Sequence, residues 1–260
     1  VADICEEIAR HYDVDGIHLD YIRYPETWKI KVSADRGRKY ITDIVRHVHN
    51  RIKPIKPYIK LSCAPIGKHD DLTRYRSFGW NAYSRVCQDA QGWLREGLMD
   101  QLFPMMYFQG KHFYPFIIDW SENAFGRIIT PGLGIYCLSA NEKNWSLETI
   151  SREMEVARQY KLGYALFRSK FFTDNTKNIY TFVQNHNSQL ALVPPMTWEC
   201  RECPKTPYNL GITGTNSLSW QHDDNNGDIY YNVYSSRDYP VDTDDGRNLV
   251  AIRLKGKNLK

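Results

Sequence analysis

The hydrophobic and polar positions of the first 190 residues predict strands alternating with helices. The predicted strands cover 14–24, 58–65, 100–108, 128–136 and 164–167, and the predicted helices cover 2–11, 40–53, 80–96, 114–125, 147–160 and 175–187. Strands separated by helices indicate a parallel sheet, and the nearly continuous apolar composition of these strands is typical of strands covered on both faces. The pattern therefore predicts an α/β fold with five strand–helix units, which are too few to close an eight-unit barrel.

The pattern changes at Val193-Pro194-Pro195, after which helical periodicity is absent. Short alternating segments follow at 209–212, 217–220, 229–234 and 249–254, separated by turn residues. The segments around Trp220 and Tyr231 predict two facing strands of a β-sandwich, but four or five strands are fewer than the roughly seven that a sandwich needs. We therefore predict an α/β domain at 1–192, a linker at 193–206 and an incomplete C-terminal β-sandwich at 207–260.

The first predicted strand carries charged and aromatic side chains at its exit. Asp20 and Arg23 flank Tyr21 there, just before Pro25. Barrel enzymes build their active sites from side chains at the carboxyl ends of strands, so we expect Asp20 to be functional. The alternative is a structural ion pair between Asp20 and Arg23. In a regular strand His18 lies on the same face as Asp20, either as a pocket residue or as a hydrogen-bonded core histidine.

Composition excludes some classes of function. The 34 basic and 30 acidic residues give a net charge of +4, too small and too evenly spread to indicate nucleic acid or an anionic membrane. No run of about 18 apolar residues is present, so we predict no membrane-spanning segment. A signal peptide is absent, but the chain begins at Val1 without Met, so this says nothing about export. Aromatic residues make up 13%, a content that both sugar-binding proteins and large cores use.

No pattern in the sequence predicts a metal or a cofactor. Cys200 and Cys203 form a C-x-x-C pair, but no second pair follows at zinc-ligand spacing, which leaves free thiols or a local disulfide. The other four cysteines stand among apolar neighbours and are expected in the core. His69 beside Asp70 and Asp71 is expected to be polar surface.

The segment Asp15-Gly16-Ile17-His18-Leu19-Asp20-Tyr21-Ile22-Arg23-Tyr24-Pro25 resembles the signature of a bacterial family of glycosidase-like proteins, the family 10 glycosidase-like or glycosyl-hydrolase-like lipoproteins. Weaker similarities follow in the four later strands, at 60–65, 100–107, 131–136 and 163–167. The resemblance implies a TIM-type (β/α)8 barrel in which these five segments are the fourth to eighth strands. It also implies a fibronectin type III-like module in the tail, and export to the periplasm or cell surface of a lipid-anchored parent.

The chain departs from that family in two respects. The sixth-strand segment usually carries Gln after its Pro, where this sequence has Met105, so a polar pocket residue is lost. The first three strands and the last sandwich strands are missing. We therefore expect this chain to be a fragment of a longer protein.

The resemblance implies glycoside hydrolysis of a polysaccharide or cell-wall glycan without a cofactor. That reaction ordinarily uses two carboxyl groups, about 5–5.5 Å apart for retention and about 6.5–9.5 Å apart for inversion. Asp20 is our candidate for the ionised carboxylate, and Arg23 would lower its pKa or bind substrate. Glu142 is the leading partner acid because Trp145, a possible stacking platform, is close to it.

Other residues remain open. Alternative partner acids are Asp70, Asp71 and Asp174, or an acid in the missing half of the barrel. His18, Tyr21, Arg23, Tyr107 and Trp145 are the expected carbohydrate-binding residues. The rival interpretations are a non-catalytic carbohydrate-binding protein on a degenerate barrel, favoured by Met105, and a hydrolase of other cell-wall bonds such as amides. The second rival needs a metal cluster or a nucleophile–base pair, which the sequence does not display.

Overall fold

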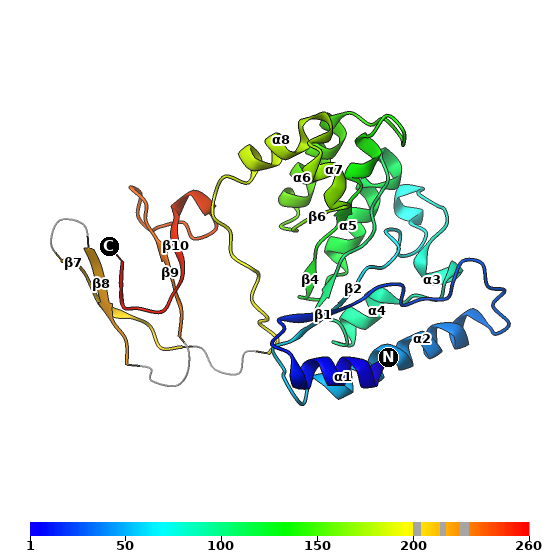
Figure 1. Ribbon diagram of the computed structural model, residues 1–260, viewed down its shortest axis with the longest axis horizontal. Helices are drawn as coiled ribbons and strands as arrows, with labels where there is room; N and C mark the ends of the chain where they lie inside the picture. The colour runs from blue at the N-terminus through cyan, green and yellow to red at the C-terminus, as the bar shows by residue number, and fades with distance from the viewer. Residues whose placement is uncertain (200–203, 214–216, 224–228, 260) are drawn as a thin grey trace. The chain divides into compact units, whose positions relative to one another are not determined.

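The computed structural model describes residues 1–199, 204–213, 217–223 and 229–259 (Figure 1). Contacts divide the chain into two compact units, Val1–Phe182 and Val183–Lys260. The predicted boundaries of the linker, at 193 and 206, stay a prediction. Cys200 and Cys203 lie outside the described residues, so the hypotheses about their thiols are not addressed by the structure.

The first unit is built on parallel strands that follow one another in chain order. One sheet contains β1 (Gly16–Leu19), β2 (Lys60–Cys63), β3 (Gln101–Leu102) and β4 (Ile128–Ile129), and a parallel pair is formed by β5 (Gly132–Leu133) and β6 (Ala165–Leu166). Met105 connects the two groups, because it forms parallel bridges to Ile66 on one side and to Gly132 on the other. A parallel sheet in sequential order is consistent with a partial α/β barrel.

Helices alternate with these strands. They are α1 (Ala2–His11), α2 (Ala34–Ile52), α3 (Ala82–Arg85), α4 (Ala90–Arg95), α5 (Tyr114–Glu122), α6 (Leu147–Gln159), α7 (Ser169–Thr173) and α8 (Ile179–His186). Short 3-10 helices occur at Thr73–Tyr75, Gly110–His112, Ile135–Leu138, Thr176–Asn178 and Gly246–Asn248. The first predicted helix, 2–11, matches α1, which packs against α2 (Figure 1). Ser33 caps α2 by accepting a hydrogen bond from the backbone N–H of Arg36.

The predicted helix at 80–96 is wrong as a single element, because the chain forms two short helices there. Asn81 caps α3 through the N–H of Ser84, and Asp89 caps α4 through the N–H of Gly92. Between them Cys87 adopts a left-handed backbone conformation with φ of 54°, which a continuous helix cannot contain. Two separate capping residues therefore overrode the helical periodicity of the apolar positions.

The strand predicted at 128–136 is also interrupted. β4 and β5 lie on either side of Thr130-Pro131, and the chain then turns into a 3-10 helix at Ile135–Leu138. Proline has no N–H to donate to a sheet, which explains the break. The paired part of the strand predicted at 100–108 is likewise short, although Met105 extends its pairing past Pro104.

A buried ion pair joins the amino ends of the two central strands. The Lys53 ammonium lies 2.8 Å from the Asp100 carboxylate, and the Asp100 side chain is 2% exposed. The same carboxylate accepts a hydrogen bond of 2.8 Å from the N–H of Leu61 in β2, while Lys53 also donates to the carbonyl of Ile59. Because both charges are hydrogen-bonded as well as paired, the arrangement compensates for their desolvation. It fixes the entry of β2 beside β3.

Large apolar side chains surround this sheet. Leu61, Cys63 and Leu102 are fully buried on the strands, and Trp93 and Trp120 are fully buried on the helices. As predicted, Cys5, Cys63, Cys87 and Cys137 are buried, and the structure shows them as free thiols. Among the described residues no helix combines the length and apolar composition needed to cross a membrane.

The second unit contains antiparallel strands in two small sheets. β7 (Tyr208–Thr213), β8 (Ser217–Gln221) and β11 (Asn258–Leu259) form one sheet, and β9 (Tyr231–Tyr234) pairs with β10 (Leu249–Leu254) in the other. The ring centroids of Trp220 and Tyr231 lie 5.1 Å apart, and the Tyr231 hydroxyl is 2.8 Å from Nδ1 of His222. The side chains predicted to face one another thus connect the two sheets.

Glu153 is a buried carboxyl group on α6, a helix that Ser146 caps through the N–H of Thr149. The residue is 1% exposed, and neither of its carboxyl oxygens has a hydrogen-bond partner. Burial raises the pKa of Glu153 to about 9. The folded protein therefore holds this side chain in its neutral form at physiological pH.

We expect Glu153→Gln to stabilise the protein at pH 8 by about 1–3 kcal/mol, because the amide does not have to take up a proton on folding, and to have little effect at pH 4. Below the usual pKa of 4.5 the carboxyl is protonated in both the folded and unfolded states. Between pH 4.5 and about 9 the unfolded state holds fewer protons, so the free energy of unfolding of the parent falls as pH rises. Urea denaturation at several pH values measures this difference, and a gap independent of pH would contradict it.

Candidate functional site

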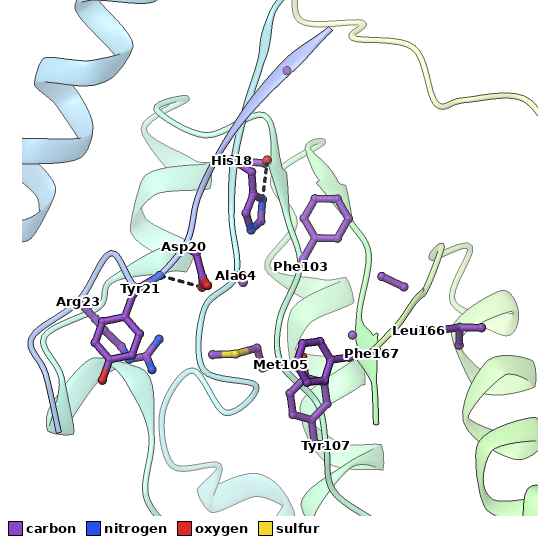
Figure 2. A pocket seen from close by; sticks show the side chains of 14 residues that line it. His18, Asp20, Tyr21, Arg23, Ala64, Phe103, Met105, Tyr107, Leu166 and Phe167 are labelled. Atoms are coloured by element: carbon purple, nitrogen blue, oxygen red, sulfur yellow. Dashed lines mark hydrogen bonds between the residues drawn. The ribbon is translucent and has the colours of Figure 1, made fainter. Parts of the chain in front are cut away.

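A cavity of about 780 Å³ opens where the parallel strands end (Figure 2). Its walls come from alternate residues of neighbouring strands and their exits, because successive side chains of a strand point to opposite faces. β1 contributes Gly16, His18 and Asp20, whereas Ile17 and Leu19 between them are buried on the other face. The remaining strands and their extensions contribute Ser62, Ala64, Phe103, Met105, Tyr107, Gly132, Ala165, Leu166 and Phe167.

His18 is fixed in the wall of this cavity. Its Nδ1 lies 3.0 Å from the Ser62 hydroxyl on β2, and its ring meets that of Phe103 edge to face at a centroid distance of 5.4 Å. Burial lowers the pKa of His18, and the charge of Asp20 acts in the opposite direction. The neutral imidazole can accept or donate one hydrogen bond at each nitrogen according to its tautomer.

Asp20 is the only carboxylate among the described residues that line the cavity. One of its oxygens accepts a hydrogen bond of 2.8 Å from the N–H of Tyr21, which leaves the other oxygen available to the cavity. Burial and the charge of Asp20 raise the pKa of Tyr107 to about 12, and the same two causes raise the pKa of Cys63. The negative charge of Asp20 thus acts on side chains of β1, β2 and the β3 extension.

Arg23 forms its ion pair with Glu26. The ion pair between Arg23 and Asp20, given above as the alternative to a functional Asp20, is not formed. Its guanidinium lies 2.8 Å from the Glu26 carboxylate and stacks on the Tyr21 ring at 3.8 Å from the ring centroid. The Tyr21 hydroxyl also donates to Glu26, and this bond, followed by those from Arg23, lowers the pKa of Glu26 to about 2. Tyr21 adopts a left-handed conformation with φ of 57°, so the turn folds these three side chains together.

Arg23 has one group without a partner. Its side chain is 7% exposed, and its Nη1 lacks a hydrogen-bond partner, although the residue lines the cavity. Sequence reasoning missed Glu26, whose position three residues after Arg23 could have suggested the pair.

An aromatic wall closes the side of the cavity opposite β1. Tyr107 and Phe167 stack with their planes 21° apart and their centroids at 5.2 Å, and Tyr136 meets both rings edge to face. Phe167 is nevertheless 46% exposed, so one face of the pair is open to a ligand. Figure 2 shows Tyr107 and Phe167 across the cavity from Asp20. The alternation of Phe103, Met105 and Tyr107 in the sequence could have identified three members of the cavity together.

Glu142 and Trp145 do not line this cavity. Glu142 is exposed in the turn after Ile135–Leu138, and its charge is one of the smaller causes that raise the pKa of Tyr136. Trp145 is 8% exposed, so its ring is part of the core rather than an open stacking platform. The structure therefore brings together His18, Asp20, Tyr21, Arg23 and Tyr107, and leaves the other two predicted residues outside. Within the described part of the chain, no cluster of His, Cys, Asp or Glu side chains is arranged to hold a metal ion.

A largely apolar and aromatic cavity at the carboxyl ends of parallel strands, with a charged group at its edge, is the usual form of a ligand site in α/β barrel proteins. Residues 29–137 match the family described as Glycosyl hydrolase-like 10. The match includes Met105 and Tyr107 and begins after His18 and Asp20. The cavity thus lies partly inside and partly outside the matched region.

The chain is also similar to two curated bacterial proteins. It is 26% identical over 287 residues to Glycosyl hydrolase YngK of Bacillus subtilis (strain 168). The aligned region covers 97% of this chain and 54% of that protein. It is 27% identical over 130 residues to Glycosyl hydrolase DigH of Escherichia coli (strain K12). That aligned region covers 41% of this chain and 29% of that protein. The chain thus spans about half the length of the first relative. Together these similarities support a relationship to glycosyl hydrolase-like proteins.

We expect Asp20→Asn to lower the pKa of His18 further. The Asp20 carboxylate favours the charged imidazolium, so its removal leaves the effect of burial unopposed. NMR titration of the imidazole protons in the parent and the variant measures the two midpoints. Equal midpoints would show that the Asp20 charge does not act on His18, and Asp13→Asn, at an exposed position ahead of β1, serves as the control.

Proposed function

We propose that this protein acts on a polysaccharide or cell-wall glycan as a glycoside hydrolase in which Asp20 is the ionised catalytic carboxylate. The observation that supports it best is the position of Asp20 in the cavity at the strand exits, across from the aromatic wall of Tyr107 and Phe167. Sugars bind such sites through their apolar faces, which stack on rings, and through their hydroxyls, which bond to polar groups. The similarity to glycosyl hydrolase-like proteins adds independent support.

In this proposal the side chains divide the work. A glycosyl ring stacks on the exposed face of Phe167, and hydroxyls bond to His18 and to the free Nη1 of Arg23. The Asp20 carboxylate acts on the anomeric carbon, either as nucleophile or by stabilising the positive charge that develops there. Glu142 remains the candidate partner acid, because it lies in the turn after Ile135–Leu138, the 3-10 helix whose Tyr136 packs against the aromatic wall.

We expect Asp20→Asn to reduce the hydrolysis of polysaccharides and aryl glycosides by at least about 100-fold, the usual effect of removing a catalytic carboxylate. Phe167→Ala should instead weaken sugar binding by roughly threefold to tenfold, as expected for a lost aromatic contact. A panel of substrates gives kcat and KM for each variant. Unchanged turnover in Asp20→Asn would refute the catalytic assignment.

A second pair of variants tests whether Glu142 is the partner acid. Glu142→Gln should lower kcat on natural glycans more than on aryl glycosides with good leaving groups, because such groups depart without protonation. Glu148→Gln, which changes an exposed glutamate at the start of α6, is the matched control. Equal activity of both variants would place the partner acid elsewhere.

A non-catalytic carbohydrate-binding protein is the second candidate function. It is favoured by the finding that Asp20 is the only carboxylate among the described lining residues, since hydrolysis ordinarily needs two. Met105 adds an apolar group to the same cavity. Absence of turnover, with sugar binding that is weakened by Phe167→Ala, would favour this function.

A further inference from the structure

A second cavity, of about 420 Å³, lies in the first unit and shares no lining residue with the first. Its walls come from the loop after β2, from the start of α4 and from α5 with the turn that follows it. Its main charged groups are four carboxylates and one guanidinium, those of Asp70, Asp71, Asp89, Asp119 and Arg95. A surplus of carboxylates in a concave site attracts cations.

The walls of this cavity are held in place by hydrogen bonds. Asp89 accepts a bond of 3.0 Å from the N–H of Gly92, and Asp119 accepts bonds from Gln91 at 2.7 Å and from Asn123 at 3.1 Å. The Trp120 indole donates to the carbonyl of Gly67, which anchors the loop after β2. The carboxylates of Asp89 and Asp119 are therefore preorganised and need little rearrangement to bind a ligand.

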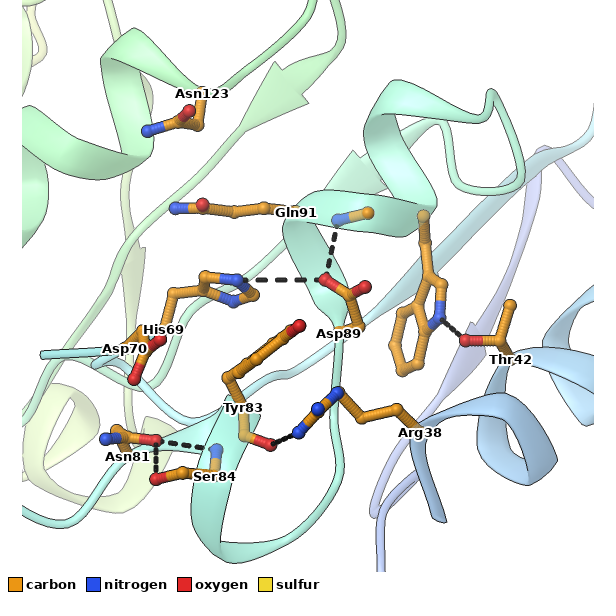
Figure 3. A network of polar contacts seen from close by, with 12 residues as sticks. Arg38, Thr42, His69, Asp70, Asn81, Tyr83, Ser84, Asp89, Gln91 and Asn123 are labelled. Carbon is orange, nitrogen blue, oxygen red and sulfur yellow. Dashed lines mark hydrogen bonds and ion pairs between the residues drawn. The ribbon is translucent and has the colours of Figure 1, made fainter. Parts of the chain in front are cut away.

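His69 supplies a buried acceptor that has no donor. Its side chain is 9% exposed, and its Nδ1 has no hydrogen-bond partner. The ring lies between aromatic neighbours, 5.5 Å from Tyr83 and 5.7 Å from Trp120 by ring centroids. Figure 3 shows Gln91 and Tyr83 on opposite sides of the His69 ring, with Asp70 beside it. An unpaired buried polar atom costs stability, so this nitrogen has a physical reason to meet a donor from outside the chain.

The protonation of His69 decides what kind of donor fits. Burial lowers the pKa of His69 to about 3, with the charges of Arg95 and Arg38 acting in the same direction, so the ring is neutral. Its Nε2 faces the Asp89 carboxylate at 3.8 Å, an arrangement that favours the tautomer with the proton on Nε2, in which Nδ1 is an acceptor. The amides of Gln91 and Asn123 are already donating to Asp119. In this tautomer the unpartnered Nδ1 can accept a hydrogen bond from a ligand.

The Asp119 carboxyl also favours a positively charged ligand. Burial raises the pKa of the Asp119 carboxyl, and the negative charges of Glu122 and Asp70 raise it further. The hydrogen bond from Gln91 and the positive charge of Arg74 act in the opposite direction. A cation bound nearby would relieve this repulsion. A primary ammonium group combines positive charge with three N–H donors, and so can serve carboxylates and an imidazole acceptor together.

We propose that this cavity binds the primary ammonium group of a small ligand, with the Asp70 and Asp119 carboxylates and Nδ1 of His69 as acceptors. Phe125, which is 46% exposed, also lines the cavity and offers an apolar face to the body of the ligand. An amino sugar and a simple alkylamine both carry this chemistry. The site is independent of the proposed hydrolase activity, because the two cavities have no residue in common.

Isothermal titration of the protein with glucosamine at neutral pH and low salt tests the proposal, with N-acetylglucosamine and glucose as matched probes that lack the ammonium group. We expect glucosamine to bind and the two neutral sugars to bind at least about tenfold more weakly, since a charge-assisted hydrogen bond contributes about that factor. Equal binding of the three sugars, or no binding of glucosamine at 10 mM (about −2.7 kcal/mol), would overturn the proposal. Propylamine separates the sources: comparable binding indicates an amine site, and absent binding indicates an amino-sugar site.

Variants assign the binding to this cavity. Asp70→Asn should weaken glucosamine binding about tenfold, whereas Asp13→Asn on the surface should leave it unchanged. Loss of binding in Asp20→Asn with retention in Asp70→Asn would place the ligand in the first cavity and refute the proposal. The ¹⁵N resonance of His69 Nδ1 should also shift when glucosamine binds, a signature that a purely structural role of Asp70 would not produce. Circular dichroism of each variant verifies that it is folded.

Discussion

The parallel register of the central strands is the constraint on which the first unit depends. Ile17 pairs with Leu61, and Ser62 pairs with Gln101, so the three strands end together. Because side chains alternate along each strand, this register aligns His18, Ser62 and Phe103 on one face and sends Ile17 and Leu61 to the other. A shift of one residue would exchange the two faces, removing both the core and the cavity.

The two ends of this sheet use charge differently. At the amino ends, the carboxylate of Asp100 is 2% exposed and is satisfied by Lys53 and by the N–H of Leu61. At the carboxyl ends, the Asp20 carboxylate accepts one hydrogen bond from the backbone, and its second oxygen can still accept a hydrogen bond from a ligand in the cavity. A carboxylate whose hydrogen-bonding positions are all occupied by the protein contributes to the fold, whereas a carboxylate with a position still open can act on a ligand. This contrast is typical of the stabilising and functional faces of α/β barrels.

The two cavities of the first unit differ in the same physical terms. The cavity at the strand exits has rings on one side and a single carboxylate among its described lining residues, which suits a neutral molecule with apolar faces and hydroxyls. The cavity beside α4 and α5 has four carboxylates and a neutral buried imidazole, which suits a cation. The loop after β2 connects them in the chain, since Ala64 lines the first and His69 lines the second. If both bind ligands, their substrate classes are set by this difference in charge.

The sequence by itself determined the order of strands and helices, because apolar periodicity and capping residues are local signals. It predicted α1 in full and the shared face of His18 and Asp20. It did not predict the break at Cys87, since two local caps competed there with a continuous helical pattern. It also did not predict that Arg23 turns to Glu26, because the left-handed conformation of Tyr21 redirects the chain. Only the tertiary structure brought Phe167 against Tyr107, buried Trp145, and left His69 without a donor, because these contacts join strands and helices that lie far apart in the chain.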